Sequence, residues 1–202
     1  MYLPSHFAVS DPARMTALMR AHPFAVVVAD PGGGDQAAHV PLLVDRQPTA
    51  DGGRIVLHGH VARANPIWRA SRALAVFRGP HAYISAAWYG EPDTVPTWNY
   101  QAVHVAGPLT VIDDAQAERA WFERLGAEHD PLAAQWWAGL SAAVFDRLRQ
   151  ATVWFRIDGE RVDGKSKLSQ NHSPGRRARV VSALRAAGGE DRLAIAQAME
   201  DG

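Results

Sequence analysis

Short apolar runs rich in β-branched residues, separated by turn residues, limit the possible fold of this chain more than any other feature. FAVVVA begins at Phe24, HVPLLV at His39 and RIVLHGHV at Arg54, and glycine-containing turns at 32–34 and 51–53 separate them. Such spacing predicts antiparallel strands. ALAVF at 73–77 and HAYIS at 81–85 predict two further strands, a long strand is expected over 99–112, and ATVWFRIDGERVDG from Ala151 returns to strand.

Helical segments interrupt and follow these strands. Ser10-Asp11-Pro12 combines a polar cap with a proline at the first turn and predicts a short amphipathic helix that ends at His22-Pro23. Asn65-Pro66 repeats the signal and predicts a brief helix, while helical spacing of apolar residues predicts an insertion over about 113–150 and helices over 173–202. Strands that surround helices without a strand–helix–strand rhythm favour a mainly β fold with α additions (α+β), a β-barrel rather than a parallel nucleotide-binding sheet.

Length and charge limit the domain organisation and the partners. The chain has 202 residues, 47% of them hydrophobic, which is enough for one substantial core. We therefore expect one domain over 1–172, with the helical insertion at about 113–150, and a C-terminal helical extension over 173–202. Because 21 basic residues balance 21 acidic ones, no long-range field gathers nucleic acid or an acidic membrane.

The cellular setting is predicted from absences. The chain has no cysteine, which excludes disulfides and thiolate chemistry. Its first residues show no basic stretch followed by an apolar run, and nowhere do 18 apolar residues follow one another. We expect a soluble, cytoplasmic protein without a membrane partner.

Polar and aromatic side chains are unusually dense between residues 39 and 104. A barrel rim with such groups suits a planar ligand, because rings supply flat faces while charged and amide groups anchor phosphate and heterocycle edges. The residues are His39, His58, His60, Arg63, Asn65, His81, Tyr83, Ser85, Trp88, Tyr89, Thr97, Trp98, Asn99, Tyr100 and His104.

The segment 59–66 is the most informative local arrangement. It places Arg63 and the helix start at Asn65-Pro66 directly after a strand, where a phosphate can meet both positive charge and free backbone N–H groups. The alternative is a surface arginine beside an ordinary capped helix, and the local pattern alone favours that alternative.

Other motifs allow weaker interpretations. Alternating histidines such as His58 and His60 point to one face of a strand, but they lack an acidic partner nearby, so we expect no metal site. No GxSxG, Walker A or GxGxxG element is present, which removes the usual support for a hydrolase, a P-loop NTPase or a Rossmann enzyme. Trp98 and Tyr100 fit core packing, a dimer interface or a ligand contact, and 165–171 alone fits a solvated loop before a helix.

Seven motifs in order across about 170 residues identify a family resemblance. They are MYLPSHF at 1–7, H-x-P at 39–41, GHVARANP at 59–66, GPHAYIS at 79–85, VPTWNY at 95–100, VHVAG at 103–107 and KLSQN at 167–171. This ordered set resembles the PaiB family of FMN-binding negative transcriptional regulators. The resemblance implies a six-stranded antiparallel split β-barrel, related to pyridoxamine-phosphate oxidases, that forms a homodimer with two FMN sites between its subunits.

The resemblance also implies which residues bind the cofactor. By motif, the phosphate and ribityl contacts are His39, His60, Ala62, Arg63 and Asn65. Tyr83, Ile84 and Ser85 line the flavin, Trp98, Asn99 and Tyr100 come from the neighbouring subunit, and Lys167, Ser169, Gln170 and Asn171 close the site. Related split barrels bind the phosphate with an Arg or Lys after the third strand, so Arg63 leads this set.

The resemblance implies two possible functions, and the charged residues near the carboxy terminus suggest a third. The first is an FMN-binding regulator that senses FMN or its redox state and acts through a partner, without turnover. The second is an FMN-dependent oxidoreductase on a small substrate, since the cofactor carries the redox chemistry. The third is direct DNA binding through Arg176, Arg177, Arg179 and Arg185, which ranks lower because acidic residues follow closely and no helix-turn-helix is evident.

Overall fold

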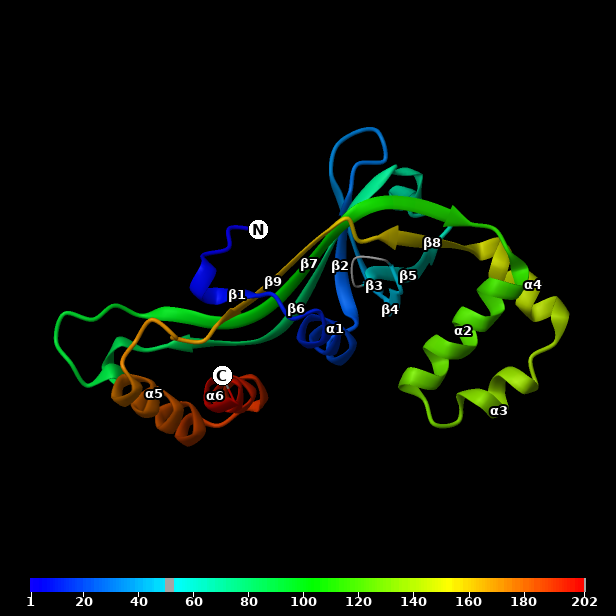
Figure 1. Cartoon of the computed structure of the whole chain (residues 1–202). Helices are drawn as coiled ribbons and strands as arrows, with labels where there is room; N and C mark the ends of the chain where they lie inside the picture. Colours follow the sequence, from blue (N-terminus) through cyan, green and yellow to red (C-terminus); the bar gives the residue numbers. More distant parts are fainter. Residues whose placement is uncertain (50–52, 202) are drawn as a thin grey trace. The chain divides into compact units, whose positions relative to one another are not determined.

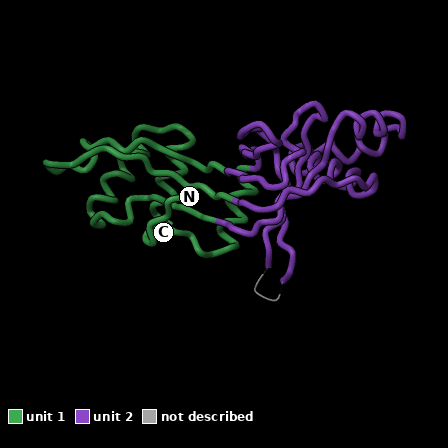
Figure 2. Tube along the Cα trace, turned by 90° about the horizontal axis from the view of Figure 1, so that it is seen from above, with its two compact units in different colours: residues 1–22, 77–104, 163–202 green, residues 23–76, 105–162 purple. Residues whose placement is uncertain are grey.

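The structure is a computed structural model that describes residues 1–49 and 53–201 (Figure 1). It is a mixed α+β fold built on an antiparallel sheet, so the predicted fold class is confirmed. The chain divides into two compact units, which Figure 2 colours separately. Unit 1 contains residues 1–22, 77–104 and 163–202, and unit 2 contains residues 23–76 and 105–162.

The helices and strands have the following bounds. The strands are β1 (Ala8–Val9), β2 (Phe24–Ala29), β3 (Gln36–Pro41), β4 (Leu43–Gln47), β5 (Arg54–Ala62), β6 (Arg72–Ile84), β7 (Thr97–Ile112), β8 (Thr152–Asp158) and β9 (Arg161–Lys167). The α-helices are α1 (Pro12–Ala21), α2 (Ala115–His129), α3 (Ala133–Ala138), α4 (Ala142–Ala151), α5 (Pro174–Ala187) and α6 (Glu190–Asp201). Three short 3-10 helices are η1 (Ser5–Phe7), η2 (Pro66–Arg69) and η3 (Ala86–Tyr89).

The strands are hydrogen-bonded in the order β3-β2-β6-β7-β8-β5-β4, and β9 pairs with both β1 and β7. Within the described residues this sheet has nine strands, where six were expected. The difference has local causes: the run at 39–44 is divided at Leu42 into β3 and β4, the last run folds as the two strands β8 and β9, and β1 has only two residues.

Unit 2 holds the predicted helical insertion, which folds as α2, α3 and α4. Its core joins these helices to the sheet through Phe122 on α2, Trp137 on α3, Phe145 on α4 and Trp154 on β8. Each helix therefore contributes one buried aromatic side chain to a single hydrophobic cluster, which is the packing expected of amphipathic helices.

Unit 1 holds the carboxy-terminal helices. Val180 and Leu184 on α5 and Ile195 and Met199 on α6 share one hydrophobic cluster with Ile84 and neighbouring residues of the 82–89 segment. The domain boundary expected at residue 172 stays a prediction, but these helices share a core with the end of β6 and with η3.

Local helix signals were predicted well. The Asp11 carboxylate accepts a hydrogen bond from the Ala13 N–H at 2.8 Å, and the Asn65 amide oxygen accepts one from the Ile67 N–H at 3.1 Å, so both expected caps are present. The turn expected at 51–53 lies outside the described residues except for Gly53.

One strand boundary was predicted wrongly. Instead of separate strands at 73–77 and 81–85, the chain forms the continuous strand β6 through Gly79-Pro80. A Cβ atom at Gly79 would lie 2.8 Å from Leu18 Cδ1 on α1 and 3.2 Å from the Gln101 carbonyl oxygen on β7. This glycine serves a close packing contact rather than a turn.

No helix among the described residues is both long and apolar enough to cross a membrane.

Candidate functional site

The predicted cofactor residues fall into two groups, one in each unit. Those of unit 2 are His39, His60, Ala62, Arg63 and Asn65. Those of unit 1 are Tyr83, Ile84, Ser85, Trp98, Asn99, Tyr100, Lys167, Ser169, Gln170 and Asn171.

Arg63, the leading phosphate candidate, is occupied by backbone carbonyls. Its Nε donates to the Gln150 oxygen at 2.7 Å, and its Nη2 donates to the oxygens of Arg149 at 3.1 Å and Thr152 at 2.8 Å. These carbonyls lie at the carboxy-terminal end of α4, where a helix leaves acceptors without intrahelical partners. The Arg63 guanidinium therefore caps α4. Only its Nη1 nitrogen takes no part in these three hydrogen bonds to backbone oxygens.

The other residues of the unit 2 group have different surroundings. His39 on β3 is exposed, with its ring 5.8 Å from that of Phe24, and Ala62 is exposed at the end of β5. The His60 ring lies 4.9 Å from the ring of Phe122 and 4.8 Å from that of Trp154, and its Nδ1 is buried without a hydrogen-bond partner among the described residues. His60 is thus partly buried, with its ring against the aromatic cluster of unit 2.

Burial gives His60 and its neighbour His58 a shared pH dependence. Desolvation lowers the pKa of His60, and it also lowers the pKa of His58, where Arg156 and Arg124 add to the shift and Asp45 opposes it. A histidine with a lowered folded-state pKa binds more protons when unfolded, so its contribution to stability is complete above the unfolded pKa of about 6.5 and is lost as the pH falls below it. We predict that the free energy of unfolding decreases between pH 7.5 and pH 5.5, by at most about 1.4 kcal/mol per pH unit for each histidine.

Urea unfolding at these two pH values measures the effect. In His60→Phe, which keeps a ring against Phe122 and Trp154 but cannot be protonated, the decrease should be smaller than in the wild type. His39→Gln removes an exposed histidine and should leave the decrease unchanged. An equal decrease in wild type and His60→Phe would contradict the role of His60.

In unit 1 the predicted loop residues hold one another in place. Asn99 is fully buried (0% exposed), its Nδ2 donates to Ser169 Oγ at 3.0 Å, and the Ser169 hydroxyl is 3.2 Å from Asn99 Oδ1. Gln170 bridges the same loop, since its Oε1 accepts from the Leu168 N–H at 2.7 Å and its Nε2 donates to the Ser166 oxygen at 2.6 Å. Ser169 has φ of 61°, a left-handed conformation that is uncommon outside glycine.

This loop forms one wall of a cavity of about 370 Å³, which we name the Lys167 cavity. Lys167 donates from Nζ to Thr97 Oγ1 at 2.5 Å and to the Trp98 oxygen at 2.7 Å. An ammonium group has three N–H donors, so one remains. Burial, followed by the nearby charge of Lys165, lowers the pKa of Lys167. The lining residues are His6, Phe7, Tyr89, Asp93, Thr94, Val95, Pro96, Thr97, Lys167, Ser169, Asn171, His172 and Arg176.

Arg176 supplies a second cation to the Lys167 cavity. Its Nη2 is paired with Glu91, which also pairs with Arg179, and its Nη1 lies 3.1 Å from His172 Nδ1. The bonded guanidinium of Arg176 lowers the pKa of Glu91, so this carboxylate stays ionised and fixes both arginines. Two guanidinium groups share one carboxylate, which leaves the cluster positive.

Tyr89 is the third notable residue of the Lys167 cavity. It is 1% exposed, and its Oη is buried without a hydrogen-bond partner among the described residues. Burial raises the pKa of Tyr89, so the hydroxyl remains a donor at neutral pH. The Arg176 guanidinium lies 5.2 Å from the centre of the Tyr89 ring.

Sequence reasoning did not assign Tyr89, His172 or Arg176 to the cofactor site. Tyr89 was recognised only as one of many rim residues, and Arg176 was interpreted as a possible DNA contact or a solvated face. The contact between Arg176 and Glu91 spans 85 positions in the chain, and no local pattern reveals it.

The remaining predicted residues of unit 1 lie at its surface or in its core. Trp98 is 52% exposed and Tyr83 is 48% exposed, and the Trp98 ring lies 5.8 Å from that of Tyr83 and 5.9 Å from that of His81. These three rings form what we name the surface ring cluster. Ile84 is buried in the core, the Ser85 hydroxyl caps η3, and the Lys165 ammonium lies 5.4 Å from the centre of the Tyr100 ring.

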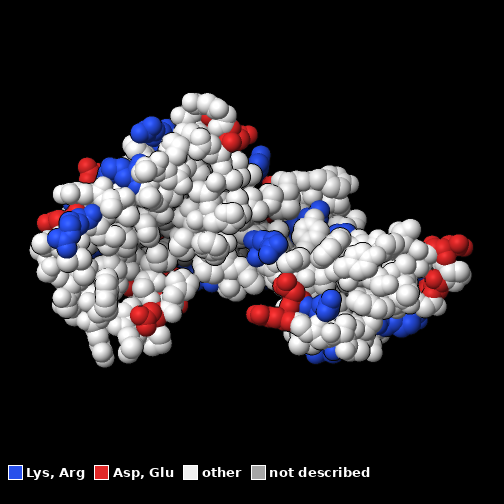
Figure 3. Space-filling model, turned by 180° about the vertical axis from the view of Figure 1, so that it is seen from behind, with Lys and Arg blue, Asp and Glu red and all other residues white. Residues whose placement is uncertain are grey.

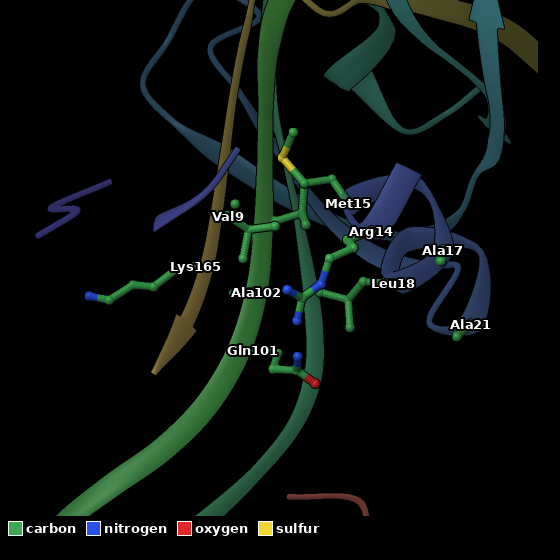
Figure 4. Close-up of a pocket in the computed structure, with 11 residues that line it drawn as sticks. Val9, Arg14, Met15, Ala17, Leu18, Ala21, Gln101, Ala102 and Lys165 are labelled. Carbon is green, nitrogen blue, oxygen red and sulfur yellow. The ribbon is translucent and has the colours of Figure 1, made fainter. Parts of the chain in front are cut away.

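A second cavity of about 350 Å³ lies beside α1 in unit 1, with mostly apolar walls (Figure 4). Met15 and Leu18 of α1 and Ala102 and Val103 of β7 are among the residues that line it. In Figure 4 the Arg14 guanidinium extends toward Gln101, while the Lys165 ammonium points away from α1 and donates to the Tyr2 oxygen at 3.1 Å. This cavity contains none of the predicted cofactor residues.

Within 1–49 and 53–201, no group of three or more His, Asp or Glu side chains is placed to hold a metal ion.

Comparison with known proteins places the chain in a family. A family model described as "Putative FMN-binding domain" matches residues 1–161. The protease synthase and sporulation protein PAI 2 of Bacillus subtilis (strain 168) is 32% identical over 208 residues, which cover 100% of this chain and 97% of the relative.

Solved structures with low sequence identity share the fold. The FAD and heme binding protein of Mycobacterium smegmatis superposes with a TM-score of 0.62 at 16% identity, over 91% of this chain and 80% of that one. The flavocytochrome Anf3 of Azotobacter vinelandii gives a TM-score of 0.57 at 13% identity, over 79% of this chain and 69% of that one.

These matches confirm the resemblance that the ordered motifs indicated, and the family description supports FMN as the cofactor. The chain belongs to the PaiB family of FMN-binding proteins.

Proposed function

We propose that this protein binds FMN as a homodimer and acts as a negative regulator of transcription that responds to the flavin. The observation that carries the proposal is the match of the FMN-binding family model over residues 1–161. The name of the Bacillus subtilis relative, a protease synthase and sporulation protein, supports a regulatory rather than a metabolic role.

The residues of unit 1 fit the chemistry of FMN. Lys167 and Arg176 offer positive charge for a phosphate, and the surface ring cluster offers flat apolar faces for a tricyclic ring. Lys167 also donates to the backbone oxygen of Trp98, so the two features are linked through one residue pair. FMN, when bound, would supply the redox chemistry of the flavin.

The exposed rings also support the homodimer. Large aromatic side chains are enriched in protein interfaces, and exposed groups of them often mark a contact surface. Trp98 and Tyr83 satisfy both conditions, since each is about half exposed and lies beside the other. A subunit interface that includes this cluster would cover a surface that is otherwise unfavourable in water.

Direct DNA binding by the carboxy-terminal helices receives less support. Arg176 and Arg179 pair with Glu91, Arg185 pairs with Glu200 at 2.5 Å, and Arg177 donates to the Met199 oxygen at 2.7 Å. Phosphate contacts would have to compete with these bonds. The face of the molecule drawn in Figure 3 carries blue and red groups interspersed rather than one continuous basic surface. We therefore propose that regulation acts through a protein partner.

An FMN titration of the purified protein tests the proposal. Protein added to FMN should change the flavin fluorescence in a saturable way, and sedimentation of the same sample should give twice the mass of one chain. NAD(P)H should not bleach the bound flavin, whereas the competing oxidoreductase function predicts bleaching. Absence of any flavin binding would refute the proposed function, and a monomer that binds FMN would refute only the homodimer.

A further inference from the structure

The Lys167 cavity and the Arg63 guanidinium offer alternative sites for a phosphate, and their hydrogen bonds distinguish them. Arg63 uses Nε and Nη2 for three backbone carbonyls, so a phosphate there would compete with the cap of α4. In the Lys167 cavity, by contrast, Lys167 keeps an N–H donor beyond its bonds to Thr97 and Trp98. Arg176 has five N–H donors, and the single N–H on Nε has no hydrogen bond among the described contacts of this residue.

The buried hydroxyl of Tyr89 is a second, independent observation. A buried donor without a partner destabilises the folded state when nothing compensates it, so such groups are rare. Tyr89 lines the same cavity as Lys167 and Arg176, its ring lies 5.2 Å from the Arg176 guanidinium, and its hydroxyl has no partner among the described residues. A ligand oxygen would satisfy it.

We propose that Lys167, Arg176 and Tyr89 bind the phosphate group of a phosphate monoester in the Lys167 cavity. This inference rests on the proposed function where the monoester is FMN, and it moves the phosphate end of the cofactor from Arg63 to this cavity. Lysine and arginine together with a neutral hydroxyl donor are a common set of phosphate ligands. The cavity, at about 370 Å³, is within the size range of small-molecule sites.

One acidic residue works against the phosphate and provides a control. Asp93 lines the cavity and has φ of 54°, a conformation that asparagine adopts as readily as aspartate. Asp93→Asn should therefore leave the backbone unchanged while it removes a negative charge. Arg78, exposed on β6 in the same unit and outside the cavity, is a matched position for a control that lowers the net charge alone.

The experiment compares FMN with riboflavin, which has the same ring system and no phosphate. In the wild type FMN should bind more tightly than riboflavin. The Kd of riboflavin divided by the Kd of FMN therefore measures how much the phosphate contributes to binding. Lys167→Met should reduce this ratio about tenfold or more, because a hydrogen bond from a charged donor is lost. Arg78→Gln should leave the ratio unchanged, and Asp93→Asn should increase it.

Tyr89→Phe tests the proposal with a variant that should still fold. It removes only an oxygen that has no partner, so the thermal midpoint should stay equal or rise, while the ratio falls about threefold to tenfold. A ratio that stays constant in both Lys167→Met and Tyr89→Phe would place the FMN phosphate elsewhere and leave the proposed function intact.

Inorganic phosphate separates the possible sources of the ligand. If phosphate raises the thermal midpoint of the wild type but not of Lys167→Met, while the flavin ratio is constant, the cavity binds a phosphate compound other than FMN. If neither the flavin ratio nor the stabilisation by phosphate responds to Lys167→Met, the inference is overturned. If no flavin binds at all, the proposed function fails, and the phosphate measurement still decides the role of the cavity.

Discussion

Replacing Trp154 by alanine should lower the free energy of unfolding by about 3–5 kcal/mol, the range for large aromatic side chains removed from cores. Trp154 is 1% exposed on β8, and its ring lies 5.0 Å from that of Phe122 and 5.5 Å from that of Trp121. Both partners belong to α2, so the cavity left behind would open where the helical insertion packs on the sheet. Urea unfolding followed by circular dichroism measures the loss.

Two further substitutions of tryptophan serve as controls for this result. Trp136→Ala removes the same side chain from an exposed position (59% exposed) whose main ring contact is with Trp137, and should cost about 1 kcal/mol or less. Trp154→Phe keeps most of the volume and removes an indole N–H that has no partner among the described residues, so about 1 kcal/mol is expected. Equal losses in Trp154→Ala and Trp136→Ala would contradict the assigned core.

The second large effect is expected at Gly107. A Cβ atom there would lie 1.7 Å from the carbonyl oxygen of Asp158, and no rotation of a side chain can relieve a contact with backbone. The turn after β8 is held against this glycine, because the Glu160 N–H donates to the Ala106 oxygen at 3.1 Å. Gly107→Ala must separate these segments, so we predict a loss of about 3 kcal/mol or more, at the upper end of overpacking effects.

Gly139→Ala is the matched control. The nearest atoms to its added Cβ are carbonyl oxygens at 3.6 and 3.8 Å, which is ordinary contact. Its φ of −85° suits any residue, so the free energy of unfolding should stay within about 1 kcal/mol of the wild type or rise. Thermal unfolding of both variants measures the difference, and a Gly107→Ala protein as stable as Gly139→Ala would show that the turn after β8 can move.

These two positions show the limits of reasoning from the sequence. Gly107 closes the VHVAG motif, which contributed only to the family resemblance. The close approach of Asp158, 51 positions later in the chain by residue number, supplies the physical reason for a glycine. Similarly, the sequence predicted separate strands on the two sides of Gly79-Pro80, while in the structure Gly79 lets α1 and β7 lie close to the continuous strand β6.

The cofactor site divides in the same way. The motifs around Asn99 and Ser169 were predicted to contact the cofactor from different subunits, whereas within one chain these two side chains are hydrogen-bonded to each other. Phosphate binding by Arg63 stays a prediction. In the structure its guanidinium donates to the end of α4, and the neighbours of Arg63 in the sequence cannot reveal that contact. Arg176 was set apart with the arginines of the last helices, although it lines the Lys167 cavity.

The sequence by itself determined the local structure of this protein: the capped starts of α1 and η2, the strand-rich fold class, the helical insertion and the family. Those features depend on residues within a few positions of one another, or on ordered motifs. Only the tertiary structure decided which charged groups are already bonded and which remain available, as for Arg63 and Lys167. Contacts of that kind join segments about 70 to 90 positions apart, and their geometry depends on the packing of the whole fold.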